Sequence, residues 1–116
     1  MFTIRKEQIT VLHKVETEKF VNRAVVHVKE FFPKQFESLG TDKLREIVRH
    51  GIERADHYRI TAKAEVLKYI DFMVLCGRDF DTAPELRWAG EILNSENPAG
   101  ARIEMLALKV KKHIKG

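Results

Sequence analysis

The chain has 116 residues, of which 44% are hydrophobic and 33% are charged, and its formal net charge is +4 at pH 7. This composition predicts one folded domain over residues 1–116 and excludes a disordered chain. No apolar run approaches the roughly 20 residues that span a bilayer, the N-terminus has no secretory signal pattern, and a single cysteine excludes an intrachain disulfide. We therefore expect a cytoplasmic protein without a membrane segment.

Apolar residues recur at helical spacing along the chain, and neither strand alternation nor a hairpin dipeptide occurs. A long first helix is predicted from Thr3 or Ile4 to about Phe32, with residues 16–18 as the expected place for a break or bend. Pro33 ends this helix or opens a short turn, because the residue before a proline is pushed out of the α region. The predicted buried stripe comprises Leu12, Val15, Phe20, Val21, Ala24, Val28 and Phe31.

A second helix is predicted from Thr41, as its N-cap, to His57 or Tyr58. Gly51 lies within the apolar stripe of this helix. Since a glycine inside a helix costs about 1 kcal/mol relative to alanine, we interpret Gly51 as a point where another helix approaches closely. The remaining stripe residues are Leu44, Ile47, Val48, Ile52 and Ala55.

Three further helices complete the prediction. Thr61 is expected to cap a third helix that ends near Cys76, with Gly77 directly after it. Residues 82–85 match a capping box that would start a fourth helix, and residues 97–98 open the last one. The sequence thus predicts an all-α, single-domain irregular bundle of about five helices with a long N-terminal helix. The later stripes are Leu86, Ala89, Ile92 and Leu93, then Ile103, Leu106, Ala107 and Val110.

The histidine and carboxylate spacings do not predict a metal site. His50 and His57 are two helical turns apart, about 10 Å along the axis, so one ion cannot bridge them. The loop 79–81 with Glu85 lacks the alternating ligands and central glycine of a calcium loop. Acidic groups that cap a helix N-terminus explain these residues better. We expect no metal and no cofactor.

No arrangement of nucleophile and base predicts an enzyme. Cys76 follows an apolar run at a helix end, which is typical of a small buried side chain. Ser38 and Ser95 lie in polar turns without a neighbouring histidine, and no carboxylate pair has the apolar surroundings that raise a pKa for acid catalysis. The interpretation from these residues is a protein without catalytic activity.

The positive charge raises nucleic-acid binding as an alternative. The second helix of the central pair, residues 62–76, offers only Lys63 and Lys68 as basic side chains and is apolar toward its end, so it is not typical of a recognition helix. The lysines of 109–115 fit phosphate contacts or a helix C-terminus equally. Residues 71–96 carry 2 Lys/Arg against 6 Asp/Glu, which indicates a solvated face or an acidic patch for a basic partner.

A longer pattern runs through the middle of the chain: Arg49-His50-Gly51-Ile52, Arg54-Ala55, Tyr58, Ile60, Val66, Tyr69-Ile70-Asp71, Met73, Gly77, Asp79-Phe80-Asp81, Pro84 and Trp88-Ala89. The pattern is similar to that of small all-helical bacterial proteins associated with type VI secretion spikes, PAAR-tipped proteins and their effectors. The likeness covers Ile4 to about Ala107, and the family brings no catalytic residues. It implies an accessory role as an adaptor, chaperone or cognate binding protein.

The leading hypothesis is a non-enzymatic protein-binding module whose partner is a secreted effector or a spike component. The alternative is a nucleic-acid-binding regulatory protein, although nucleic acid is the less favoured partner. Trp and Arg are enriched at binding hot spots, and loops on a rigid scaffold often carry function. A competing interpretation makes Phe80, and less so Trp88, a core anchor. The predicted partner-binding residues are Arg78, Asp79, Asp81, Arg87 and Trp88.

Overall fold

The computed structural model describes residues 10–115, with side chains from residue 16 on. Within this part of the chain there are six α-helices, one short 3-10 helix and no strand, so the all-α class is confirmed there. The sixth helix, which was not among the five expected, begins at Pro33, and this proline occupies its first helical position. The elements are α2 (Thr10–Phe31), α3 (Pro33–Leu39), α4 (Thr41–His57), α5 (Lys63–Cys76), η1 (Pro84–Leu86), α6 (Arg87–Leu93) and α7 (Ala99–Lys115).

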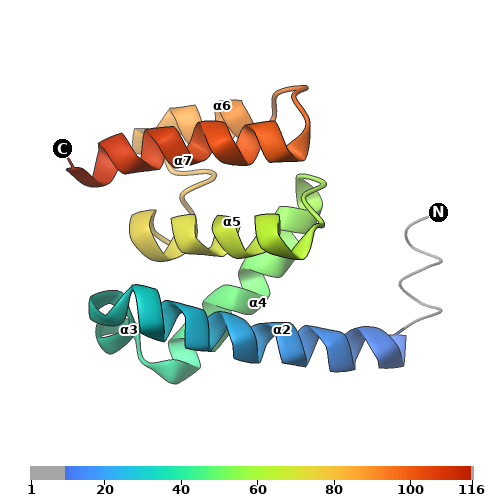
Figure 1. The fold of residues 1–116 in the computed structure, drawn as a ribbon. Coiled ribbons are helices and arrows are strands. Elements are labelled where there is room, and N and C mark those ends of the chain that lie inside the picture. Colours follow the sequence, from blue (N-terminus) through green and yellow to red (C-terminus); the bar gives the residue numbers. More distant parts are fainter. Residues whose placement is uncertain (1–9, 116) are drawn as a thin grey trace.

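Helix α5 occupies the centre of the fold. It packs against α4 on one side and against α7 on another (Figure 1). Helix α2 packs on α3 and α4, while α6 packs on α7. No helix among the described residues is both long and apolar enough to cross a membrane.

One apolar core joins these helices. Most predicted stripe positions are buried, because side chains three and four residues apart share one helix face. Phe31 is an exception and is 63% exposed, since it ends α2 just before the chain turns at Pro33. The positions Leu12 and Val15 lie outside the described side chains. The largest fully buried side chains are Tyr69, Phe80, Leu44, Ile60, Ile70, Met73, Leu106, Val21, Val28 and Val48.

Helix α2 is continuous through residues 16–18, so the predicted break is wrong there. Two arginines of α4 hold Glu18, at 3.0 Å from Arg45 and 2.6 Å from Arg49. The hydrogen bond from Arg49 is the main reason why the pKa of Glu18 falls below its usual value. These polar residues join two helices instead of interrupting one. The predicted start at Thr3 or Ile4 lies outside the described residues.

The predicted side-chain caps do not form. Gly40, with φ 82°, precedes α4, and Thr41 is the first residue of the helix instead of its cap. Ala62, not Thr61, is the residue before α5. The capping box at 82–85 is also absent: the Thr82 hydroxyl donates to the Asp79 carbonyl at 3.3 Å, and Pro84 begins η1 instead.

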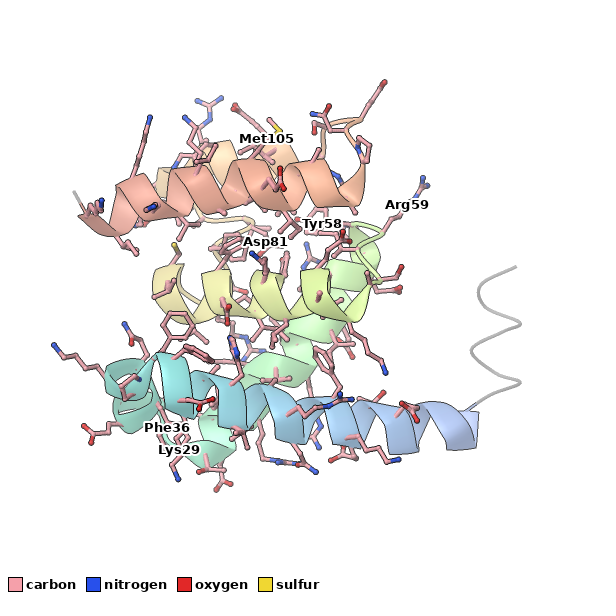
Figure 2. All side chains as sticks on the ribbon, in the orientation of Figure 1. Lys29, Phe36, Tyr58, Arg59, Asp81 and Met105 are labelled. Atoms are coloured by element: carbon pink, nitrogen blue, oxygen red, sulfur yellow. The ribbon has the colours of Figure 1, made fainter. Side chains whose placement is uncertain are left out.

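The C-terminal end of α4 was predicted correctly, and the structure shows its mechanism. The Ile60 N–H donates to the Ala55 carbonyl at 2.8 Å, and the Arg59 N–H donates to the Asp56 carbonyl at 2.9 Å. This is a Schellman motif, in which the residue after the cap adopts the left-handed conformation. Arg59 takes that position with φ 64°, and Figure 2 shows its side chain pointing away from the helices.

Gly51 marks the closest approach between α4 and α5, as predicted. The residue is buried. A Cβ atom added there would lie 2.8 Å from Ile70 Cγ1 and 2.8 Å from Met73 Sδ. Both atoms belong to α5, so only a glycine lets the two helices pack at this separation. The position of Gly77 after α5 is also confirmed, with φ 115°.

Candidate functional site

The segment Arg78 to Trp88 connects α5 to α6, and its first two candidate residues face α4. Arg78 Nη1 lies 3.7 Å from Glu46 Oε1. Asp79 Oδ1 lies 3.5 Å from His50 Nε2. Both Arg78 and Asp79 are exposed, so they remain available to a partner.

The last two candidates belong to α6, and Trp88 contacts another helix, α7. Arg87 is highly exposed and lies 4.0 Å from Glu91 within the same helix. The ring of Trp88 is half-buried, with its centroid 6.2 Å from that of His113 on α7. Among the described residues, no ion pair or ring contact joins these two residues to Arg78 or Asp79. Arg78 and Asp79 therefore contact α4, whereas Arg87 and Trp88 contact residues of α6 and α7.

Asp81 is buried, with 5% of the residue exposed. Its carboxylate lies 2.8 Å from Arg54 Nη2 and accepts a hydrogen bond from the Tyr58 hydroxyl at 2.9 Å (Figure 2). Asp81 is thus neither an exposed partner contact nor the helix cap that the sequence favoured. Phe80 beside it is 1% exposed and anchors the loop to the core.

This buried cluster shifts the pKa values of its members. Burial, followed by the hydrogen bond to Asp81, raises the pKa of Tyr58. Burial opposes the charge of Arg54, but hydrogen bonds to Asp81 and Tyr58 outweigh it and raise the Arg54 pKa. Burial also raises the pKa of Tyr69 in the adjoining core. All these shifts favour the charge states that hold the cluster together at neutral pH.

Arg102 is a buried residue that the sequence analysis missed. Its guanidinium donates from Nη1 to the carbonyls of Tyr58 and Leu93, each at 2.9 Å, and from Nε to the Asn97 carbonyl at 2.9 Å. The ends of α4 and α6 are thereby tied to α7. Arg102 lies four positions before the stripe residue Leu106. This helical spacing could have placed Arg102 on the buried face of α7 from the sequence.

A second missed contact joins α2 to α5. His27 Nε2 donates to the Asp71 carboxylate at 3.0 Å, and the pair is largely shielded from solvent. Burial raises the pKa of Asp71, although His27 opposes that shift. No group of three or more His, Cys, Asp or Glu side chains gathers at metal-binding distance among the described residues. Cys76 is half-buried instead of fully buried, and burial raises the pKa of its thiol.

Two shallow depressions mark the surface. The α3–α5 cleft has a volume of about 300 Å³ and is lined chiefly by Gln35, Leu39, Lys43, Ile47, Met73 and Arg78. The α5–α7 groove has a volume of about 230 Å³ and is lined chiefly by Phe32, Lys68, Phe72, Leu75, Lys111 and Ile114. Large apolar side chains are also exposed on two helices. They are Val26 and Phe31 on α2 and Met105, Leu108 and Ile114 on α7.

Comparison of the chain with protein-family models, with curated proteins and with solved structures found no match.

Proposed function

We propose that the protein is a non-enzymatic protein-binding module. The observation that carries the proposal is apolar surface on the outside of α7, where Met105 and Leu108 are 40% and 66% exposed. The two residues are three positions apart and so share one helix face. Figure 2 shows Met105 on the side of α7 away from α5. A single exposed apolar residue is ordinary, but neighbouring ones on one face favour contact with another protein.

The polar residues of the interior support a binding role over a catalytic one. Arg54, Tyr58 and Asp81 satisfy one another, and Arg102 is engaged by backbone carbonyls. Groups that are already hydrogen-bonded inside the core act on packing and position. The raised pKa of Cys76 lowers its thiolate fraction, and the thiolate is the nucleophilic form.

The sequence likeness extends the proposal to a cytoplasmic accessory of type VI secretion. The partner is then a secreted effector or a spike component, and the chain acts as its adaptor, chaperone or cognate binding protein. Arg78, Asp79, Arg87 and Trp88 remain proposed contacts because they are exposed or half-exposed. Asp81 is not retained, because its carboxylate is occupied inside the fold.

Capture of a partner from native lysate on the immobilised full chain, followed by mass spectrometry, tests the proposal. The double variant Asp79→Lys with Arg87→Glu reverses two side chains that are 70% and 83% exposed. It should reduce capture while leaving the circular dichroism melt nearly unchanged. The pair Arg23→Glu with Glu53→Lys is the control, because it makes the same charge changes at exposed positions outside the loop.

A second pair of variants tests the apolar face. Met105→Ser with Leu108→Ser should weaken capture without lowering the melting temperature, since both side chains are already exposed. If no protein is captured, or if neither pair of variants reduces capture, the protein-binding proposal is wrong. If only the apolar pair reduces capture, the loop between α5 and α6 is a structural connector.

Nucleic-acid binding is the second candidate, because α7 exposes several lysines. Its test is a gel shift at two salt concentrations, since phosphate contacts make affinity fall steeply with salt. The central helix α5 packs between α4 and α7, so it is not free to enter a DNA groove. A shift that weakens with salt would therefore assign nucleic-acid binding to phosphate contacts of the α7 lysines, and the absence of a shift would exclude this candidate. The exposed lysines are Lys109, Lys111, Lys112 and Lys115.

A further inference from the structure

The α5–α7 groove is an apolar depression with walls from separate helices. Phe72 and Leu75 of α5 line it, together with Ile114 of α7 and Phe32 at the joint between α2 and α3. Its volume is about 230 Å³. A cavity of about 150 Å³ accommodates benzene, so the groove has room for one or two large apolar side chains.

Apolar side chains at the edge of the groove remain in contact with solvent. Ile114 lines the groove and is 51% exposed. Phe31 is 63% exposed, and its ring centroid lies 5.0 Å from that of His27. The same histidine lies 6.1 Å from the ring of Phe32 and donates to Asp71, and both of these residues line the groove. The exposed aromatic surface of Phe31 therefore adjoins the groove.

The charge at the groove is positive. Lys68 of α5 and Lys111 of α7 line it, and both are exposed. Asp71 is the acidic residue of the lining, and its carboxylate already accepts from His27. Lys111 forms no ion pair with any described residue, and Lys115 follows it one helical turn later on the same face. An incoming carboxylate would find Lys111 beside the apolar floor without an ion pair to a described residue, whereas Lys68 already interacts electrostatically with Asp71.

We propose that this groove binds an acidic amphipathic helix of another protein, which inserts one or two large apolar side chains between Lys68 and Lys111. The proposal rests on the protein-binding function above and names the chemistry of the partner. Amphipathic helices bind apolar grooves through residues at i, i+3 or i+4 and i+7. Glutamates or aspartates that flank those anchors would pair with the lysines.

Two other occupants fit the groove less well. A second copy of the chain would bring the same lysines against each other, and like charges at an interface cost several kcal/mol. A membrane surface is bound by helices that project an apolar face into the lipid. The groove instead recesses its apolar floor, because Phe72 is 6% exposed.

A phage-displayed library of random peptides about four helical turns long, selected on the immobilised full chain, tests the proposal. The selected peptides should combine acidic residues with large apolar residues at helical spacing. Their affinities are then measured as labelled synthetic peptides by fluorescence polarisation. Lys68→Glu with Lys111→Glu should weaken binding by about tenfold or more, because attraction becomes repulsion.

Matched variants distinguish the loss of contacts in the groove from a general effect of net charge on binding. Lys109→Glu with Lys112→Glu changes the net charge equally at exposed positions that do not line the groove, and it should change affinity far less. Ile114→Ala should weaken binding severalfold. Val26→Ala on α2, at a more exposed apolar residue outside the groove lining, should not.

The outcomes distinguish binding of an acidic helix in this groove from the broader proposal that the chain binds another protein. Peptides that are not acidic, or whose binding survives Lys68→Glu with Lys111→Glu, overturn the groove assignment but leave a protein-binding function in place. A failed selection overturns the groove assignment, and a failed lysate capture as well overturns both. Sedimentation with phosphatidylcholine–phosphatidylglycerol vesicles that is lost in the same variant would assign the groove to a membrane. A dimer dissociated by Ile114→Ala would assign it to a second copy.

Discussion

Replacing Gly51 by alanine tests the packing of α4 on α5 with a single methyl group. The added Cβ would lie 2.8 Å from both Ile70 Cγ1 and Met73 Sδ, well inside ordinary van der Waals contact. The Met73 side chain can rotate away because it is unbranched. Ile70 is β-branched and stiff at χ1, so relief there requires α5 itself to move.

Two opposing contributions set the size of the effect. Alanine favours a helix interior over glycine by about 1 kcal/mol, while overpacking a core costs about 1–3 kcal/mol. The net change for Gly51→Ala is therefore a destabilisation of about 0–2 kcal/mol. Gly51→Leu adds further atoms at the same contact, so its cost should reach about 3 kcal/mol. For a chain of this length that corresponds to a fall of roughly 10 °C in melting temperature.

Urea unfolding followed by circular dichroism gives the free energy of each variant. Gly100→Ala is the matched control, since its Cβ would meet only Glu65 Oε2 at 3.1 Å, the mobile end of a flexible side chain. That variant should be neutral or slightly stabilised. If Gly51→Leu unfolds at the same or a higher urea concentration than the unmodified chain, the close contact between α4 and α5 is refuted.

Three further predictions concern buried or strained residues. Asp81→Ala should lower the free energy of unfolding on the order of 3 kcal/mol, because it leaves Arg54 charged without its buried partner; Tyr58→Phe should cost about 1.5–3 kcal/mol, and urea melts in which neither variant loses stability would contradict the cluster. Arg59→Gly should raise the melting temperature by a few degrees, since a side chain in the left-handed region costs about 1 kcal/mol or more; a lower value would show that Arg59 contributes a compensating contact. Because burial raises the pKa of the Cys76 thiol, the midpoint of its alkylation rate should lie at a higher pH in the folded chain than in denaturant, and equal midpoints would rule out the shift.

The helices were predictable because their signal is local and repeated. A stripe such as that of α4 spans several turns, and each buried position supports the same assignment. Gly51 added information because a glycine destabilises a helix interior, so a glycine on the buried face indicates a specific role. In the structure this role is to allow the close approach of α5. The caps were less predictable, since a threonine near a helix start can bond in a turn instead. Thr82 does so with the Asp79 carbonyl.

The buried polar residues were missed because their partners are distant in sequence. Asp81 sits between Phe80 and Thr82 in a segment that fits a helix cap equally well. Only the fold brings it to Arg54, which is 27 positions away in sequence. Arg102 similarly bonds carbonyls from separate segments. For Arg102, a charged residue at a position of the apolar stripe was the usable signal. A buried charge needs a hydrogen-bonding partner, but the sequence does not show which group that partner is.

The fold also changes the charge expected of a partner. The acidic stretch 71–96 left open a patch for a basic protein, but several of its acids already have partners within the fold. Asp81 and Glu91 pair with Arg54 and Arg87, and Asp71 and Asp79 contact His27 and His50. Internal pairing weakens the negative field at the surface. The lysines of α7 have no such partners among the described residues, so positive charge dominates beside the α5–α7 groove. An acidic partner is favoured, and its association rate should fall as salt shortens the screening length.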